Sequence, residues 1–389
     1  MPVPPSPLER WFTQHPAPYQ VFLGGAAAAA WCQKEISDLL ELDSWPHFGW
    51  DYATPEGDPE LREAIAAAEG LPHRNQVLLT LGASEANYLA FLSLITPEDE
   101  VIIQSPSYPQ FECLAQSMGA RMVPCWMPAA SPSAIDEAEL ISLMTPRTRL
   151  IVLNSPHNPS GRELTPQQLK RIVDAVRRHP IAFLLVDEVY RDVGGAGPNK
   201  SRILATLGPE RLMVSQSVSK SWALPGVRTG WLAGDKKVIQ DAIIWREHLG
   251  LALPSVATAW VKHLWPYQNK LITANQTLLG HNRRQVAAFF SQHPWLHWDT
   301  SAATAIGLLG VRPEVLSDFD ARKFALACYA EERALLVPGC TIGYPGRLRI
   351  GYGHRSAETL AEAVNYVVRR LSFWVESVAP PSSQGTGSS

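Results

Sequence analysis

The sequence lacks several features that would place it in other classes of protein. It has no excess of basic residues, with 34 Lys and Arg against 37 Asp and Glu and a net charge of -3. A nucleic acid or an anionic membrane is therefore not an expected partner. The five cysteines are scattered and show no C-x-x-C spacing, so neither a disulfide framework nor a metal site is expected, and a reducing cytoplasm is favoured.

Long apolar stretches are also missing. No segment reaches the roughly 18 uncharged apolar residues that a membrane span needs, and the start, MPVPPSPLERWF, has neither the basic nor the apolar region of an export signal. Residues 379–389, APPSSQGTGSS, are too polar to bury side chains and are expected to form a disordered tail. The remaining chain, in a sequence of 389 residues that is 46 % hydrophobic, predicts a sizeable core and more than one domain.

From about residue 76 onward, short apolar runs alternate with stretches of helical character. The runs are VLLT (77–80), VIIQ (101–104), RLIVLN (149–154), FLLVD (183–187), RLMVSQ (211–216) and GWLAG (230–234). Continuous apolar strands separated by helices predict an α/β fold with a mostly parallel sheet, covered by helices on both faces. The chemistry of such a sheet lies at the carboxyl ends of its strands.

The character of the chain changes at about residue 269. A long helical stretch, a loop-rich region, a helix over 321–333, the short strand LRIGYG and a helix over 357–371 follow one another. This order predicts a smaller α/β domain over 269–378, after a large domain over 46–268. Residues 1–45 show no strand pattern and are expected to pack on the small domain or over the site entrance.

One lysine stands where a buried strand ends. The segment SVSKSWALPGVRTGW follows the RLMVSQ run and contains Lys220, Ser217 and Arg228. An aldehyde cofactor needs a nucleophilic amine, and a desolvated lysine among cationic groups supplies one. Ser217 and Arg228 are suited to hold a phosphate. A surface lysine flanked by serines is the alternative for this segment taken alone.

The end of the FLLVD run carries a carboxylate, Asp187, followed by Tyr190. A carboxylate at that depth needs a donor or loses its charge. The pyridinium nitrogen of pyridoxal 5′-phosphate (PLP) is such a donor, and pairing with it keeps the ring an electron sink. Tyr190 is placed to bond the ring hydroxyl. A cap for the following helix is the alternative role of Asp187.

Three more strand ends carry polar or aromatic groups that suit the same cofactor. In NSPHNPSG, Asn158 is a candidate donor to the ring oxygen, whereas His157 is expected to be structural. In TLGASEANYLAF, the amides of Ala83 and Ser84 begin a helix and suit the phosphate. Tyr108, in SPSYPQF, is placed to stack on the ring. A helix cap and a core aromatic are the alternatives for these last two segments.

Taken in order, these segments resemble fold-type I PLP-dependent enzymes of the class I/II aminotransferase family. The resemblance implies that family's transferase fold, with a mostly parallel seven-stranded sheet. It also implies that Lys220 forms the Schiff base with PLP and that Arg349, in RLRIGYG, binds the carboxylate of an amino acid substrate. Arg347 remains an alternative. A homodimer is implied, in which Tyr52 of DYATPEGDPELREAI reaches the phosphate of the partner's site.

The family's usual substrate segment, G-x-P-[DE], is replaced here by VFLGGAAAAAWC. PLERWF, the lysine loop and LLVPG are most similar to capreomycidine synthase-like enzymes, which cyclise hydroxylated arginines. That similarity favours dehydration and guanidine addition over transamination, with arginine oxidation as a third hypothesis. Cyclisation needs an acid and a carboxylate that orients the guanidinium, for which Glu9 and Asp51 are candidates and His248 a weaker one. A solvated helix residue and a turn residue are their alternative roles.

Overall fold

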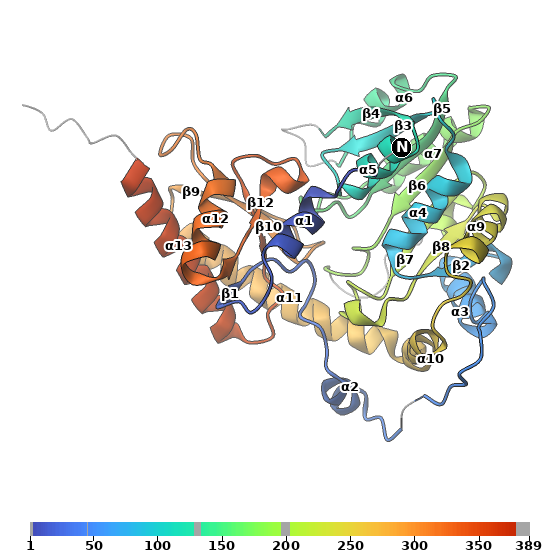
Figure 1. Ribbon diagram of the computed structural model, residues 1–389, viewed down its shortest axis with the longest axis horizontal. Coiled ribbons are helices and arrows are strands. Elements are labelled where there is room, and N and C mark those ends of the chain that lie inside the picture. The colour runs from blue at the N-terminus through green and yellow to red at the C-terminus, as the bar shows by residue number, and fades with distance from the viewer. Residues whose placement is uncertain (1–2, 45, 128–133, 196–202, 379–389) are drawn as a thin grey trace, which may run out of the picture.

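The computed structural model describes residues 3–44, 46–127, 134–195 and 203–378. They form a large and a small domain that lie side by side (Figure 1). The tail expected at residues 379–389 lies outside the described residues. None of the described helices is long and apolar enough to cross a membrane.

The large domain is built on a seven-stranded sheet of order β2-β8-β7-β6-β5-β3-β4. The bounds are β2 (Val77–Thr80), β3 (Glu100–Ser105), β4 (Arg121–Trp126), β5 (Thr148–Asn154), β6 (Phe183–Asp187), β7 (Leu212–Ser217) and β8 (Gly230–Gly234). Strand β8 runs antiparallel to β2 and β7, and the other adjacent pairs are parallel. The predicted fold class, including the mostly parallel sheet, is therefore confirmed.

Both faces of this sheet are buried, which explains the continuous apolar runs. In β6, Leu184 and Val186 belong to the core on one face, and Leu185 belongs to the core on the other. Helices supply the cover: α3 (Pro59–Glu69), α4 (Ala83–Leu94), α5 (Gln110–Ser117), α6 (Glu137–Ser142), α7 (Pro166–Arg178), α8 (Ile203–Leu207), α9 (Lys236–Leu249) and α10 (Ser255–Leu264). Short 3-10 turns, η1 (Arg74–Gln76), η2 (Pro225–Val227) and η3 (Trp265–Tyr267), connect these elements.

Strand β4 is absent from the predicted runs. It lies at the edge of the sheet, pairs only with β3 among the described strands, and contains Arg121 and Pro124. An edge strand tolerates a proline and exposes part of its surface, so its sequence lacks the apolar signature of the central strands.

The small domain contains a four-stranded antiparallel sheet of order β12-β13-β10-β9. Its elements are α11 (Gln268–Ser291), β9 (Leu296–Thr300), β10 (Ile306–Val311), α12 (Ala321–Glu332), β11 (Ala334–Leu335), β12 (Val337–Pro338), η4 (Gly339–Ile342), β13 (Leu348–Gly351) and α13 (Ala357–Val378). Two of these strands, β9 and β10, occupy the region predicted as loop-rich. Helix α11 begins among core residues of the large domain and ends among those of the small domain (Figure 1).

The first part of the N-terminal segment packs against the small domain, whereas residues 33–40 pack in the core of the large domain. The segment forms α1 (Pro7–Gln14), β1 (Val21–Phe22) and α2 (Gln33–Leu40), and β1 pairs in parallel with β11. The indole of Trp11 donates to the carbonyl of Leu336 at 2.8 Å. Strand β1 left no pattern in the sequence, because a two-residue strand is too short to show alternation.

Candidate active site

A cavity of ≈ 320 Å³ lies between the strand ends of the large domain, the small domain and helix α1. Residues from all three regions line it. Those predicted from the sequence are Glu9, Ala83, Ser84, Tyr108, Asn158, Asp187, Tyr190, Lys220 and Arg349. The structure thus brings together positions spread over most of the chain.

Asp187 is held at the end of β6 by two donors. The side-chain amide of Asn87 donates to Oδ2 at 2.9 Å, and the backbone N–H of Val189 donates to Oδ1 at 2.9 Å. Burial nevertheless raises the pKa of Asp187. A cationic donor in the cavity would restore the charged carboxylate, which is the role predicted for the pyridinium nitrogen.

Lys220 lies in the loop after β7, with its amine 5.9 Å from the ring centre of Tyr190. Burial, with the nearby Arg349 guanidinium, lowers the pKa of Lys220 to about 8. A larger share of this amine is uncharged near neutral pH than of an ordinary lysine, so it is suited to attack an aldehyde. Burial likewise raises the pKa of Tyr190 to about 12, which keeps its hydroxyl protonated as a donor.

The pKa of Lys220 predicts how the apoenzyme captures PLP. Only the uncharged amine is a nucleophile, so the rate of covalent capture should rise with pH through about 8 and level off above it. The same stopped-flow measurement with a free lysine analogue should still be rising at that pH, because the ordinary lysine pKa is about 10.4. A capture rate that keeps rising through pH 10 would contradict the depressed pKa.

Arg349 and Glu9 line the cavity from the side of the small domain. Arg349, on β13, is buried and donates to the carbonyl of Gly24 at 2.9 Å, while its Nε has no partner in the described part of the chain. Burial lowers the pKa of Arg349. Glu9, on α1, accepts a hydrogen bond from the hydroxyl of Tyr108 at 3.1 Å. An anionic group of a ligand can thus bind Arg349, and a cationic group can bind Glu9.

The start of α4 and the loop after β7 meet at one end of the cavity. Arg228 donates to the carbonyl of Leu81 at 2.9 Å, and its Nη1 lies 3.5 Å from the hydroxyl of Ser219. Gly82 has a φ of +82°, and a Cβ there would lie 2.7 Å from Nη2 of Arg228. The hydroxyl of the buried Ser217 accepts from the amide of Ser219. This cradle of amides, hydroxyls and a guanidinium suits a phosphate.

Several candidate residues lie elsewhere. Tyr52 is 89 % exposed and lines a separate groove. Asp51 is exposed and lines neither that groove nor the cavity. His248 is exposed at the end of α9. Arg347 approaches Asp299 at 3.9 Å instead of the cavity. The roles of Tyr52 and Asp51 stay predictions, because a site shared between two chains is not tested by one chain.

His157 has a structural environment, as expected. It is fully buried, and its ring nitrogens lie 2.8 Å from the hydroxyl of Ser160 and 2.8 Å from the carbonyl of Pro106. Burial lowers its pKa to about 4, so it stays neutral and ties the loop after β5 to the loop after β3.

Sequence reasoning missed Asn87 and assigned no role to Asn154. Asn154 lines the cavity, donates to the carbonyl of Asp187 at 2.9 Å and accepts from the amide of Asn158 at 2.7 Å. A signal existed for Asn87, which is the one polar side chain among the buried residues of helix α4. Phe12, Phe22 and Val189 also line the cavity and carry no comparable signal.

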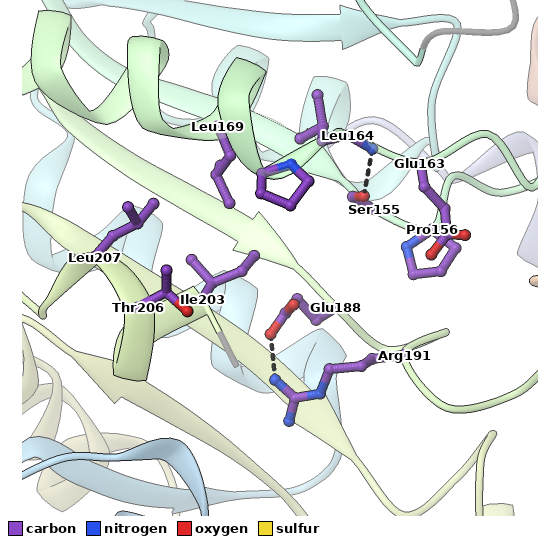
Figure 2. Close-up of a pocket in the computed structure, with 11 residues that line it drawn as sticks. Ser155, Pro156, Glu163, Leu164, Leu169, Glu188, Arg191, Ile203, Thr206 and Leu207 are labelled. Atoms are coloured by element: carbon purple, nitrogen blue, oxygen red, sulfur yellow. Dashed lines mark hydrogen bonds and ion pairs between the residues drawn. The ribbon is translucent and has the colours of Figure 1, made fainter. Parts of the chain in front are cut away.

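A separate pocket, of ≈ 290 Å³, opens beside the loop that follows β6 and contains none of the predicted site residues. Figure 2 shows Glu188 facing Arg191 there, and the hydroxyl of Ser155 bonded to the amide of Leu164. Arg191 also binds the buried Glu69 at 2.5 Å. Its charge is therefore compensated by two carboxylates, which is typical of a structural ion pair.

Comparison with known proteins agrees with this geometry. The model of the aminotransferase class I and II family matches residues 50–367. The chain belongs to this family. Capreomycidine synthase of Streptomyces vinaceus is 31 % identical over 302 residues, which cover 76 % of this chain and 75 % of that one. An aspartate aminotransferase of Pyrococcus horikoshii is 28 % identical over 339 residues, or 83 % and 84 % of the two chains.

Two solved structures share the fold over nearly the whole chain. A PLP-dependent aminotransferase of Streptococcus suis has a TM-score of 0.85 at 23 % identity, covering 96 % of this chain and 99 % of that one. The PLP-dependent cyclase OrfR has a TM-score of 0.84 at 23 % identity, covering 96 % and 97 %. PLP is the cofactor of this family member.

The residues present fit PLP. The buried carboxylate of Asp187 suits the ring nitrogen, the amine of Lys220 suits the aldehyde, and the Gly82 cradle suits the phosphate. The side-chain Oδ1 of Asn158 is buried and has no partner among the described residues, and the NH₂ of the same side chain is a donor that suits the ring oxygen. The predicted roles of these residues gain support from the cavity that they share.

Proposed function

We propose that this PLP-dependent enzyme converts a hydroxylated L-arginine into a cyclic amino acid of the capreomycidine or enduracididine type. The reaction loses water and adds the substrate's own guanidine group to the carbon that carried the hydroxyl. The observation that carries the proposal is the placement of a carboxylate, Glu9, in the same cavity as Lys220 and Arg349. The similarity to capreomycidine synthase supports it.

In this proposal each residue has one task. Arg349 binds the α-carboxylate, Glu9 orients the cationic guanidinium, and Lys220 removes the proton from Cα. When bound, PLP supplies an electron-withdrawing ring that makes this Cα proton acidic. Asp187 holds a proton on the ring nitrogen, and the Tyr190 hydroxyl donates to the ring oxygen. The Tyr108 hydroxyl keeps the Glu9 carboxylate turned into the cavity.

A composite site is part of the proposal. Tyr52 and Trp50, two positions apart in the sequence, are 89 % and 87 % exposed. Exposed aromatic side chains are typical of a surface that another chain covers. We infer a homodimer in which Tyr52 reaches the phosphate of the partner's site and Asp51 lies beside the partner's substrate. Size measurement of the holoenzyme tests this state, and a monomer would exclude the composite site.

An aminotransferase that moves an amino group between an L-amino acid and a 2-keto acid is the alternative function. The similarity to aspartate aminotransferases and to the arginine–pyruvate transaminase of Pseudomonas aeruginosa favours it. The cavity serves both reactions up to the removal of the Cα proton. After that step the two functions separate: cyclisation expels the hydroxyl and closes the ring, whereas transamination removes the amino group.

The decisive experiment mixes the holoenzyme with arginine, 3-hydroxyarginine or 4-hydroxyarginine, with and without a 2-keto acid. Cyclisation predicts a product that is one water lighter than a hydroxyarginine, formed without keto acid. Transamination predicts a keto acid product whose continued formation needs the added acceptor. Mass spectrometry of the products distinguishes these outcomes, and the second one would establish the alternative function.

The Glu9→Gln variant is expected to lose the preference for a cationic side chain. Hydrogen bonds to charged groups contribute about 1.5–3 kcal/mol, so the wild-type enzyme should bind arginine about 10- to 100-fold more tightly than its neutral isostere citrulline. Glu9→Gln should bind the two nearly equally. Titration calorimetry gives both constants, with the exposed Glu358→Gln as a matched control. An unchanged preference in Glu9→Gln would remove Glu9 from the substrate site.

A further inference from the structure

A second cavity, of ≈ 250 Å³, adjoins the first. Both cavities are lined by Phe22, Ala26 and Lys220. The rest of the wall of the second cavity comes from residues 25–30, the η2 turn, the end of β13 and His354. A substrate group that lies beside Lys220 and Ala26 can therefore touch residues of both cavities.

Hydrogen bonds and close backbone packing hold the wall formed by residues 26–30 in place, although it contains neither helix nor strand. The amide of Ala29 donates to the carbonyl of Gly353 at 2.6 Å, and Arg355 donates to the carbonyl of Ala29 at 2.7 Å. A Cβ on Gly353 would lie 1.8 Å from the carbonyl oxygen of Ala27, so only glycine allows this approach. The wall presents methyl groups and backbone, which leaves room for a ligand.

Two ionisable residues are among the described residues that line this cavity, Lys220 and His354. Lys220 acts at Cα in the proposed reaction. Ring closure involves a second proton, on the guanidinium nitrogen that forms the new bond. His354 is the other residue lining the second cavity that can take up a proton.

The tautomer of His354 follows from its contact. Its Nε2 lies 2.8 Å from the carbonyl oxygen of Phe22, and a carbonyl only accepts, so Nε2 carries the hydrogen and Nδ1 carries the lone pair. No described residue is hydrogen-bonded to Nδ1. Burial lowers the pKa of His354, so the ring is neutral near pH 7 and Nδ1 is ready to accept a proton.

We propose that Nδ1 of His354 accepts the proton of the guanidinium nitrogen that closes the ring, which makes His354 a second proton-transferring residue of the site. This inference rests on the proposed cyclisation. A guanidinium carries five N–H groups, so one edge can bind Glu9 in the first cavity while another nitrogen faces His354 in the second. Glu9 lines only the first cavity and His354 only the second, so each residue binds a different edge of the planar guanidinium.

The steps balance without an oxidant or a reductant. For 3-hydroxyarginine, the Cα–H bond breaks and its proton passes to Lys220, and then the C–O bond at Cβ breaks and the hydroxyl leaves as water with a proton from solvent. The guanidinium nitrogen forms the C–N bond, which makes its N–H acidic, and this proton passes to His354. Lys220 returns its proton to Cα, and His354 releases its proton to solvent. The net change is the loss of one water.

The tautomer is tested in the holoenzyme by ¹⁵N NMR of the histidine rings, with His354→Gln used to assign the signal. The expected result is a protonated Nε2 and an unprotonated Nδ1 for His354 at neutral pH. The opposite tautomer, or a charged ring at that pH, would overturn the proposal. This measurement does not depend on turnover.

The role is tested by comparing two rates in His354→Gln. Glutamine can still donate to Phe22 through its amide but cannot take up a proton. Exchange of the arginine α-proton in D₂O needs Lys220 alone and should keep the wild-type rate, whereas cyclic product from the hydroxyarginine should form about 10²- to 10⁴-fold more slowly. His281→Gln, at an exposed position of α11, is the control and should match the wild type in both rates.

The remaining outcomes separate the two proposals. If the wild type forms cyclic product and His354→Gln does so equally fast, the role of His354 is wrong and the proposed function stands. If exchange and ring closure fall together in His354→Gln, His354 supports the site as a whole and the specific role is again wrong. If the wild type forms no cyclic product from either hydroxyarginine, the proposed function fails, and the role of His354 fails with it.

Discussion

Replacing Lys220 by alanine is expected to abolish covalent attachment of PLP and to slow exchange of the substrate α-proton by at least about 10²- to 10⁴-fold. The range is the usual contribution of a positioned general base. Lys220 lines the cavity, and its depressed pKa suits both attachment and proton removal. Intact mass after borohydride reduction measures attachment, and NMR in D₂O measures exchange.

The control for this prediction is Lys236→Ala. Lys236 is exposed at the start of α9, so its loss should leave attachment and exchange at wild-type values. Retention of covalent PLP by Lys220→Ala would show that another lysine holds the cofactor and would refute the central assignment of the site.

Replacing Asp187 by asparagine is expected to leave PLP attached to Lys220 but to slow α-proton exchange by about 10²- to 10³-fold, the usual loss when one preorganised electrostatic partner is removed. The amide keeps the size of the side chain and one acceptor oxygen, but it cannot hold a proton on the ring nitrogen. The same mass and exchange measurements apply. Unlike Lys220→Ala, the Asp187→Asn variant should keep PLP covalently attached.

Asp174→Asn is the matched control for the charge change. Asp174 forms an exposed ion pair with Lys170 at 2.7 Å, and such pairs contribute about 0–1 kcal/mol to stability. The variant should exchange the α-proton at the wild-type rate. Exchange in Asp187→Asn as fast as in this control would mean that the ring nitrogen is not paired with residue 187.

The accuracy of the predicted fold followed the depth of each strand. Strands β5, β6 and β7 are buried on both faces, so their apolar runs were recognisable one by one. Strand β4 lies at an edge, and the two-residue β1 is too short for any pattern. Strand β10 is the exception, because it is buried at every position but two glycines interrupt its apolar run, IGLLGV, within the region predicted as loop-rich.

The candidate site was predictable where a single segment carried the signal. Asp187 ends the buried strand β6, and Asn158 and Lys220 lie in the loops after β5 and β7. The ends of parallel strands meet at one edge of the sheet. Asn87 was missed because its partner, Asp187, is 100 residues away. His354 was missed because nothing in GYGHRS indicates that it lines a cavity with Lys220.

The sequence by itself determined the fold class, the cofactor chemistry and the strand-end residues that suit PLP, because periodicity and residue type are local properties of the chain. Only the tertiary structure decided which residues share a cavity. It placed Glu9 against Tyr108, put Arg349 and not Arg347 in the lining of the first cavity, and put His354 and Lys220 in the lining of the second. These contacts join α1, the large domain and the small domain, and their distances depend on how the domains pack, which no local pattern encodes.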